Sequence, residues 1–195
     1  MTEDTEKETP ERPSDPIADR LIASRQVLIC EAIDQKMAKR VTAQLLAMAA
    51  DSDEPITMFI NSQGGHVEAG DTIHDIIQFI KPKVRMIGTG WVASAGTHIF
   101  LAAEKADRFC LPNTRFLIHQ PSGGVGGKVS DIEIQAEQIE KMRERLAQII
   151  SDTTGTDIET VRKDIERDKW MSTQEAIDYG ILSKVVTSSG ELPDG

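Results

Sequence analysis

The sequence predicts an α/β fold with a mostly parallel sheet, and two observations carry this prediction. Apolar runs of strand length alternate with amphipathic helical patterns along most of the chain. Two successive strands also end in glycine-bearing turns that lead into helices, at Gly64-Gly65 and from Gly90 to Gly96. Ligands of such sheets bind at the carboxyl ends of the strands. We therefore expect the functional site where these two turns meet.

The individual elements follow from periodicity and from capping residues. Asp34 is a suitable N-cap for the first long helix. Ser130 with Glu133, and Ser172 with Glu175, have the spacing of capping boxes. The predicted strands are 25–30, 56–60, 84–88, 107–111, 115–118 and 184–186. The predicted helices are 34–50, 67–80, 97–103, 130–153, 158–166 and 172–180.

The length of 195 residues suits one domain with a substantial core. We place this domain at residues 20–187. Residues 1–19 are acidic and carry three prolines that should interrupt any helix, so we expect a disordered tail. Residues 188–195 form a short polar C-terminal tail.

Composition excludes several classes of function. The net charge of −10 disfavours nucleic-acid binding. No apolar run approaches the roughly 20 residues of a membrane span, and no apolar signal region opens the chain, so we expect a cytoplasmic protein without a membrane partner. The two cysteines lie in neither a CxxC pair nor a Cys/His cluster, which gives no reason to expect a metal.

The glycine-rich segment 122–128 superficially resembles a phosphate-binding loop. It departs from that pattern because Ser122 replaces the first glycine and Val129 replaces the final serine or threonine. We therefore expect no nucleotide site and no cofactor.

Ser94 is the candidate nucleophile. It lies between a predicted strand and a predicted helix, and its small neighbours leave room for a substrate backbone. Backbone N–H groups at the start of a helix carry partial positive charge and suit an oxyanion. The plain alternative is a tight strand–helix junction packed with small residues.

A nucleophilic serine needs a base, and four histidines are candidates. His119 closes a predicted strand, which would hold it rigidly, and His98 is its rival because it follows Ser94 by four residues. His66 follows the first glycine turn, and His74 lies on the polar side of the next predicted helix. Thirty-two carboxylates leave the acid open. An α/β-hydrolase is disfavoured because Val92 stands where Gly-x-Ser-x-Gly requires glycine.

A set of ordered motifs lies between about residues 27 and 186. They are Phe59-Ile-Asn-Ser-x-Gly-Gly65, Gln78-Phe-Ile-Lys-Pro82, Gly90-x-x-Ala-Ser94-x-Gly96, Arg108-Phe-Cys-Leu-Pro-Asn113, Ile118-His-Gln-Pro121, Asp131-Ile-Glu-Ile134, Glu166-Arg-Asp168, Ser172-x-x-Glu-Ala176 and Tyr179-Gly-Ile-Leu182. These motifs resemble those of the proteolytic subunits of the caseinolytic (Clp) protease family. This resemblance implies the Clp protease/crotonase-like fold, with repeated ββα units, a mostly parallel sheet and a protruding handle helix.

The resemblance implies a serine endopeptidase that cuts unfolded polypeptides into short peptides through an acyl-enzyme. Ser94 would be the nucleophile, His119 the general base and Asp168 the orienting carboxylate. Gly65 and Ala95 would donate backbone N–H groups to the oxyanion.

The resemblance also implies a substrate-binding surface. It would include Gly64 and His66, and the segment with Ser122, Gly123 and Gly124, which would pair with the substrate as an extended strand. The family usually has methionine at the position of Ala95 and an apolar residue at that of Ser122.

Assembly is implied in the same way. Two stacked seven-membered rings of this chain would enclose a chamber, joined through the handle helix and an inter-ring ion pair at Glu166 and Arg167. A hexameric AAA+ ATPase unfoldase would feed it. The first alternative is a catalytically weak or regulatory ring subunit of a mixed assembly. A more distant one is an acyl-CoA hydratase or isomerase of the related crotonase-like fold.

Overall fold

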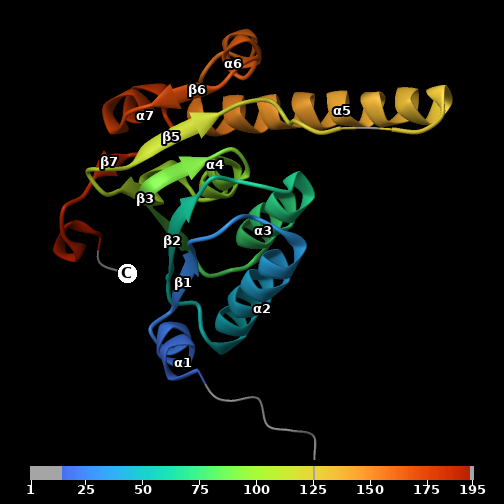
Figure 1. Ribbon diagram of the computed structural model, residues 1–195. Helices are drawn as coiled ribbons and strands as arrows, with labels where there is room; N and C mark the ends of the chain where they lie inside the picture. The colour runs from blue at the N-terminus through green and yellow to red at the C-terminus, as the bar shows by residue number, and fades with distance from the viewer. Residues whose placement is uncertain (1–14, 125, 194–195) are drawn as a thin grey trace, which may run out of the picture.

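The computed structural model describes residues 15–124 and 126–193 as an open sheet flanked by helices, with one long helix extending from the body (Figure 1). The strands are β1 Gln26–Ile29, β2 Ile56–Ser62, β3 Val84–Ala93, β4 Arg108–Cys110, β5 Arg115–Ile118, β6 Lys169–Met171 and β7 Lys184–Val185. The helices are α1 Pro16–Ala23, α2 Gln35–Asp51, α3 Val67–Phe79, α4 Ala95–Phe100, α5 Val129–Thr154, α6 Ile158–Asp164 and α7 Thr173–Tyr179, with 3₁₀ turns η1 Lys105–Asp107 and η2 Ser189–Glu191.

The sheet is mostly parallel, as predicted. Its path runs β1-β2-β3-β4-β7, with β5 beside the second half of β3 and β6 beside β5. Every described pair of strands is parallel except β5 with β6. The long strand β3 joins the two parts because it pairs with β4 through residues 86–88 and with β5 through residues 91–93. The carboxyl ends of β2, β3 and β5 therefore lie at one edge, since Ser62 pairs with Val92 and Ala93 pairs with Leu117.

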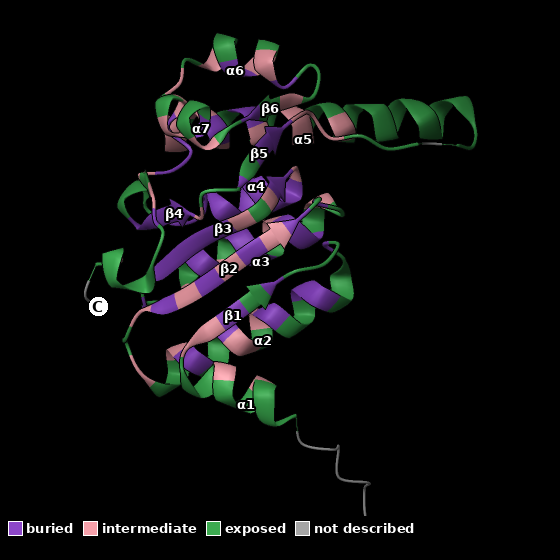
Figure 2. Cartoon of the chain, turned by 60° about the vertical axis from the view of Figure 1, so that its left-hand side comes forward, coloured by how far each residue is buried: buried purple, intermediate pink, exposed green. Residues whose placement is uncertain are grey.

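The core lies between the sheet and helices α2, α3 and α4. In α2 the predicted apolar face is buried, and the predicted cap forms because the Asp34 side chain accepts a hydrogen bond from the N–H of Met37. Strand β2 alternates buried and half-buried residues, since the helices cover only one of its faces. Figure 2 shows the buried residues concentrated in the strands and the sheet-facing sides of these helices. The buried face of α2 consists of Met37, Ala38, Val41, Leu45 and Met48.

The predicted N-terminal tail is wrong at its inner boundary. Residues 16–19 belong to α1, where Asp15 is the N-cap and Pro16 is the first helical residue. Proline is favoured at this position because its missing N–H would have no helical acceptor anyway. Residues 1–14, the rest of the predicted tail, lie outside the described residues. At the other end, η2 is folded, and Arg85 donates a hydrogen bond to the carbonyl of Pro193.

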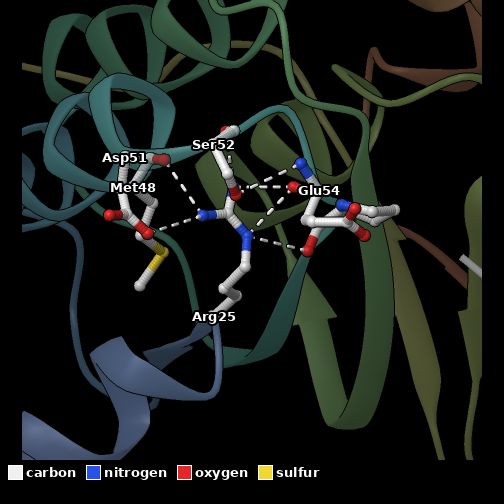
Figure 3. A network of polar contacts seen from close by, with 6 residues as sticks. Arg25, Met48, Asp51, Ser52 and Glu54 are labelled. Carbon is white, nitrogen blue, oxygen red and sulfur yellow. Dashed lines mark hydrogen bonds and ion pairs between the residues drawn. The ribbon is translucent and has the colours of Figure 1, made fainter.

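Arg25 closes the junction between α1, β1 and the C-terminal end of α2 (Figure 3). It has a left-handed backbone with φ of 55°. Its half-buried guanidinium donates hydrogen bonds to the carbonyls of Met48, Ser52 and Glu54. A cation is favourable where helix carbonyls lack intrahelical donors. The Arg25 side chain thus satisfies carbonyl groups at the C-terminal end of α2 and holds the loop that leads into β2.

The helix α5 is the protruding helix. Its buried residues are Ala147 and Ile150, so only its C-terminal part packs on the body, and Figure 2 shows the distal turns exposed. The predicted capping box of Ser130 is wrong, because α5 begins at Val129 and Ser130 already has a helical backbone. The capping box of Ser172 with Glu175 is confirmed. Among the described residues, no helix is long and apolar enough to cross a bilayer.

Candidate active site

Ser94 lies on a strained turn between β3 and α4. The strand continues to Ala93 rather than ending at 88 as predicted, so the turn is the serine alone. Its φ of 56° and ψ of −122° are unusual for a residue with a Cβ. The Ser94 N–H donates to the carbonyl of Leu117, and Thr97 Oγ1 donates to the same carbonyl, 2.8 Å away. Strain that is held in place in this manner is typical of functional sites.

His119 follows β5 directly and faces the serine. The register pairs Ala93 with Leu117, so the residues after each strand end lie side by side. The Nε2 atom of His119 is 2.8 Å from Ser94 Oγ, a hydrogen-bond distance. The structure therefore brings the predicted serine and the preferred histidine together.

Asp168 reaches the other side of the same imidazole. The antiparallel register pairs Ile118 with Lys169, which sets the preceding Asp168 opposite His119. His119 Nδ1 lies 2.9 Å from Asp168 Oδ1. Gln120 reinforces this arrangement, since its N–H donates to the carbonyl of Ile165, 2.7 Å away. The short antiparallel pair is thus the element that joins the carboxylate to the histidine.

The two glycine-bearing turns meet beside Ser94. Gly64 and Gly65 have φ of 93° and 153°. An ideal Cβ on Gly64 would lie 3.0 Å from the N atom of Ala95, so the turn after β2 contacts the start of α4. The N–H of Ala95 is the first of α4 and has no acceptor within that helix. The backbone hydrogen bonds outside the regular elements of the described residues include none donated by Gly65.

The rival histidines make other contacts. His98 and His74 are both buried, and their rings stack with centroids 4.4 Å apart. The prediction that His74 lies on a polar face is wrong, because α4 covers that side of α3. His98 Nε2 lies 2.9 Å from Asp71 rather than beside the serine hydroxyl. The half-exposed His66 is the N-cap residue of α3, 3.5 Å from Glu68.

A narrow pocket opens beside Ser94 and His119. Its cavity volume is about 30 Å³. Helix α5 contributes apolar side chains and Arg145, whereas α3 contributes Asp71 and α4 contributes His98. Sequence reasoning missed Asp71 and Arg145, because only the packing of α3 and α5 around α4 brings them to the serine. The apolar lining includes Val67, Ala95, Met142, Leu146 and Ile149.

The other predicted site residues are exposed. Ser122, Gly123 and Gly124 lie on the segment that runs from β5 toward the tip of α5, and the two glycines have open space around them. Glu166 and Arg167 lie on the surface before β6, where Glu166 forms a 2.9 Å ion pair with Arg143 of α5. No group of metal-ligating side chains capable of holding an ion is found within residues 15–124 and 126–193.

A serine on a strained strand-to-helix turn, hydrogen-bonded to a histidine that contacts a carboxylate, is the arrangement typical of serine hydrolases. Comparison with known proteins narrows this class. The Clp protease family model matches residues 9–189. The chain therefore belongs to the Clp protease family and is a Clp-type serine peptidase.

Named relatives agree with this assignment. The chain is 59% identical to an ATP-dependent Clp protease proteolytic subunit of Paracoccus denitrificans, over 88% of this chain and 86% of the relative. It is 56% identical to an ATP-dependent Clp protease proteolytic subunit 3 of Rhizobium etli, over 88% and 89%. ClpP1 from Listeria monocytogenes superposes with a TM-score of 0.83 at 51% identity, covering 91% of this chain and 99% of that chain. The predicted family and fold are thereby confirmed.

Proposed function

We propose that this chain is the proteolytic subunit of an ATP-dependent protease, with Ser94 as nucleophile, His119 as general base and Asp168 as the orienting carboxylate. The observation that carries the proposal is the hydrogen-bonded series through one imidazole. Nε2 lies 2.8 Å from the serine oxygen, and Nδ1 lies 2.9 Å from the carboxylate. A base so placed can remove the hydroxyl proton, while the carboxylate fixes the tautomer and stabilises the imidazolium.

Acylation follows from this geometry. Ser94 Oγ attacks the peptide carbonyl, its proton passes to His119 Nε2, and a tetrahedral oxyanion forms. His119 then returns the proton to the leaving amine, and the C–N bond breaks to give an acyl-enzyme. Water attacks the ester in the same manner, with His119 again accepting a proton, and the freed carboxylic acid regenerates the serine.

The oxyanion is held by the N–H groups of Gly65 and Ala95. Their turns contact each other beside the serine, and neither N–H is used by a helix or by the loop bonds described above. Removing one such donor typically costs about 10²–10³ in rate. Substrate lies extended along Ser122–Gly124, where the open space around the glycines lets another backbone approach. Gly64 and His66 belong to the same proposed substrate-binding surface.

Two seven-membered rings of this chain stack through α5 and enclose a chamber. The support is the exposed apolar surface at the distal end of α5, where Val129, Ile132 and Ile134 are exposed. Such residues on a protruding helix mark a surface that another protein covers. Glu166 and Arg167 lie near the base of α5, next to the strand that follows Asp168, so ring contact and placement of the acid are linked.

A hexameric AAA+ ATPase supplies unfolded polypeptide to this chamber. The support is the name of the relatives, which are ATP-dependent Clp protease subunits. We assign ATP binding to this partner, and the glycine-rich segment 122–128 of this chain departs from the phosphate-binding-loop pattern at Ser122 and Val129.

The decisive experiment is labelling with a fluorophosphonate probe, followed by mass mapping of the modified residue. We expect modification of Ser94 in the wild-type chain and none in Ser94→Ala. Ser189→Ala, in the exposed turn η2, is the matched control and should label normally. Native mass measurement of each variant should give the mass of fourteen copies.

Undiminished labelling of Ser94→Ala would overturn the nucleophile assignment. Absence of labelling in a correctly assembled wild-type protein would favour a regulatory ring subunit instead. A native mass other than fourteen copies would overturn the proposed ring assembly.

A further inference from the structure

The pocket beside Ser94 has apolar walls and a polar base. Met142, Leu146 and Ile149 of α5 provide apolar lining, and His98 and Asp71 provide the polar groups together with Arg145. Because the pocket adjoins Ser94 and His119, we place in it the side chain of the P1 residue, the residue whose carbonyl Ser94 attacks. The polar base is therefore positioned to select the end of the P1 side chain.

His98 is the most buried polar group in this base. Its side chain is 5% exposed, and Nδ1 has no hydrogen-bond partner among the described residues. Nε2 lies 2.9 Å from Asp71 Oδ1, so Nδ1 is the ring nitrogen without a polar neighbour. Stacking on His74, with 4° between the ring planes, keeps the ring from turning toward water. Buried polar atoms are normally paired, so this imidazole lacks a partner that a ligand can supply.

The negative charge of Asp71 and the positive charge of Arg145 lie together in the pocket and offset each other. Asp71 forms an ion pair with Arg145 and lies 2.9 Å from His98 Nε2. Burial alone would raise the pKa of Asp71, but His98 and Arg145 outweigh it and hold the pKa below its usual value. The carboxylate is therefore ionised beside a guanidinium. An acidic P1 side chain would be repelled by the Asp71 carboxylate, and a basic one would be repelled by the Arg145 guanidinium.

We propose that His98, Asp71 and Arg145 select substrates whose P1 residue ends in an uncharged amide, glutamine above all. The amide of glutamine both donates and accepts hydrogen bonds, so it can pair with an imidazole nitrogen, with the Asp71 carboxylate and with the Arg145 guanidinium. The proposal rests on the proposed function and names the substrate class of that site.

The shape of the pocket favours glutamine over other amide and polar residues. The cavity of about 30 Å³ holds two or three waters, since one water needs about 10–15 Å³ by this measure. Such a space admits an unbranched chain more readily than an aromatic ring. The methylene groups of glutamine contact Leu146 and Met142, while its amide extends to the base of the pocket. Methionine has a similar length and shape but no amide, and is thus the matched comparison.

The test uses the full-length assembled chain and four fluorogenic peptides that differ only at P1, which is Gln, Met, Glu or Lys. We expect kcat/KM for the Gln peptide to exceed that for the Met peptide about tenfold, as for a hydrogen bond in a partly open site. The Glu and Lys peptides should be cleaved more slowly than the Met peptide. In His98→Phe, which keeps a ring for the stack but removes both nitrogens, the Gln-to-Met ratio should fall to about one.

The matched control is His74→Phe, which replaces the stacking partner outside the pocket lining and should retain the ratio. A wild-type preference for Met over Gln would overturn the proposal. So would an unchanged ratio in a His98→Phe protein that still reacts with a fluorophosphonate probe. If the wild-type chain neither reacts with the probe nor cleaves any of the four peptides, the proposed function is refuted instead.

Discussion

Gly64 packs directly against Ser94. An ideal Cβ on Gly64 would lie 2.6 Å from Ser94 Cβ and 2.7 Å from the carbonyl oxygen of Ala93. Real Cβ atoms do not approach other atoms so closely, and the φ of 93° at Gly64 would itself strain any other residue. The turn after β2 and the turn after β3 therefore pack closely against each other at the point where we place the oxyanion.

This contact makes Gly64→Ala a sensitive test of the site. The added methyl group must displace either the Ser94 turn or the Gly64-Gly65 turn, which moves Gly65 relative to Ala95. We expect peptide hydrolysis to fall about 10²-fold or more, the typical cost of one oxyanion donor. The measurement is kcat for a fluorogenic peptide, with native mass to verify assembly.

The control is Gly190→Ala in η2. An ideal Cβ there would lie 4.0 Å from Ser188 Oγ, an ordinary contact, and the site is remote from the serine. Activity should be unchanged in this variant. Full activity of Gly64→Ala would show that the two turns separate freely, contrary to the geometry.

Much of the fold could be predicted because local signals agreed with the tertiary structure. The Asp34 cap, the apolar face of α2 and the Ser172 capping box all formed as expected. The errors lie where local rules conflict with context. Pro16 begins a helix instead of preventing one, and β3 continues past Gly88 because β5 provides a second pairing partner for its distal half.

The same contrast between local sequence signals and tertiary packing applies to the site. The residues around Ser94 made it a candidate nucleophile beside the alternative of a tight strand–helix junction, and strand-end placement favoured His119 modestly over His98. The proposed acid could not be chosen among the carboxylates without the family resemblance, because only the antiparallel register of β5 with β6 sets Asp168 beside the imidazole. The burial of His74 also depends on packing between two helices, which a single helix pattern does not contain.

Asp168→Asn tests the orienting carboxylate. Its side chain is 63% exposed, so water weakens its electrostatic effect on His119 relative to a buried acid. Loss of a buried triad aspartate costs about 10⁴ in kcat. We therefore expect a smaller loss of about 10²–10³-fold, measured as kcat for peptide hydrolysis.

Asp178→Asn is the matched control, since Asp178 is an exposed aspartate of α7 that contacts Gln174. It should retain full activity. If Asp168→Asn also retained full activity, another group would have to orient His119, and the proposed role of Asp168 would be lost.

Arg25→Ala tests the junction at the end of α2. The substitution leaves the carbonyls of Met48, Ser52 and Glu54 without their donor and removes a half-buried charge. Hydrogen bonds to charged groups contribute about 1.5–3 kcal/mol, so we expect the free energy of unfolding to fall by about 2–3 kcal/mol. The measurement is the urea midpoint with an unchanged m-value.

Arg25→Lys should recover only part of this loss, because one ammonium cannot reach all three carbonyls. Arg20→Ala, on the exposed side of α1, is the control and should shift the midpoint little. Equal midpoints for Arg25→Ala and Arg20→Ala would contradict the role assigned to the Arg25 network.

The buried stack of His74 on His98 makes stability depend on pH. Burial lowers the pKa of His74 from its usual 6.5, and the adjacent His98 lowers it further, whereas Asp75 and Asp71 oppose the shift. Between the folded pKa and 6.5 the unfolded chain binds more protons than the folded chain. The contribution of His74 to stability is therefore fully present above pH 6.5 and is lost as the pH falls from 6.5 toward the folded pKa, by at most about 1.4 kcal/mol per pH unit.

His74→Phe removes this titration while keeping an aromatic ring against His98. We expect its denaturation midpoint to depend less on pH between 6.5 and 5 than that of the wild-type chain. His66→Gln, at a half-exposed position, should retain the wild-type dependence and serves as the control. Because His98, Asp71 and Arg145 remain in both variants, the difference between their pH profiles isolates His74. Identical profiles would mean that His74 is not held neutral by burial in the folded chain.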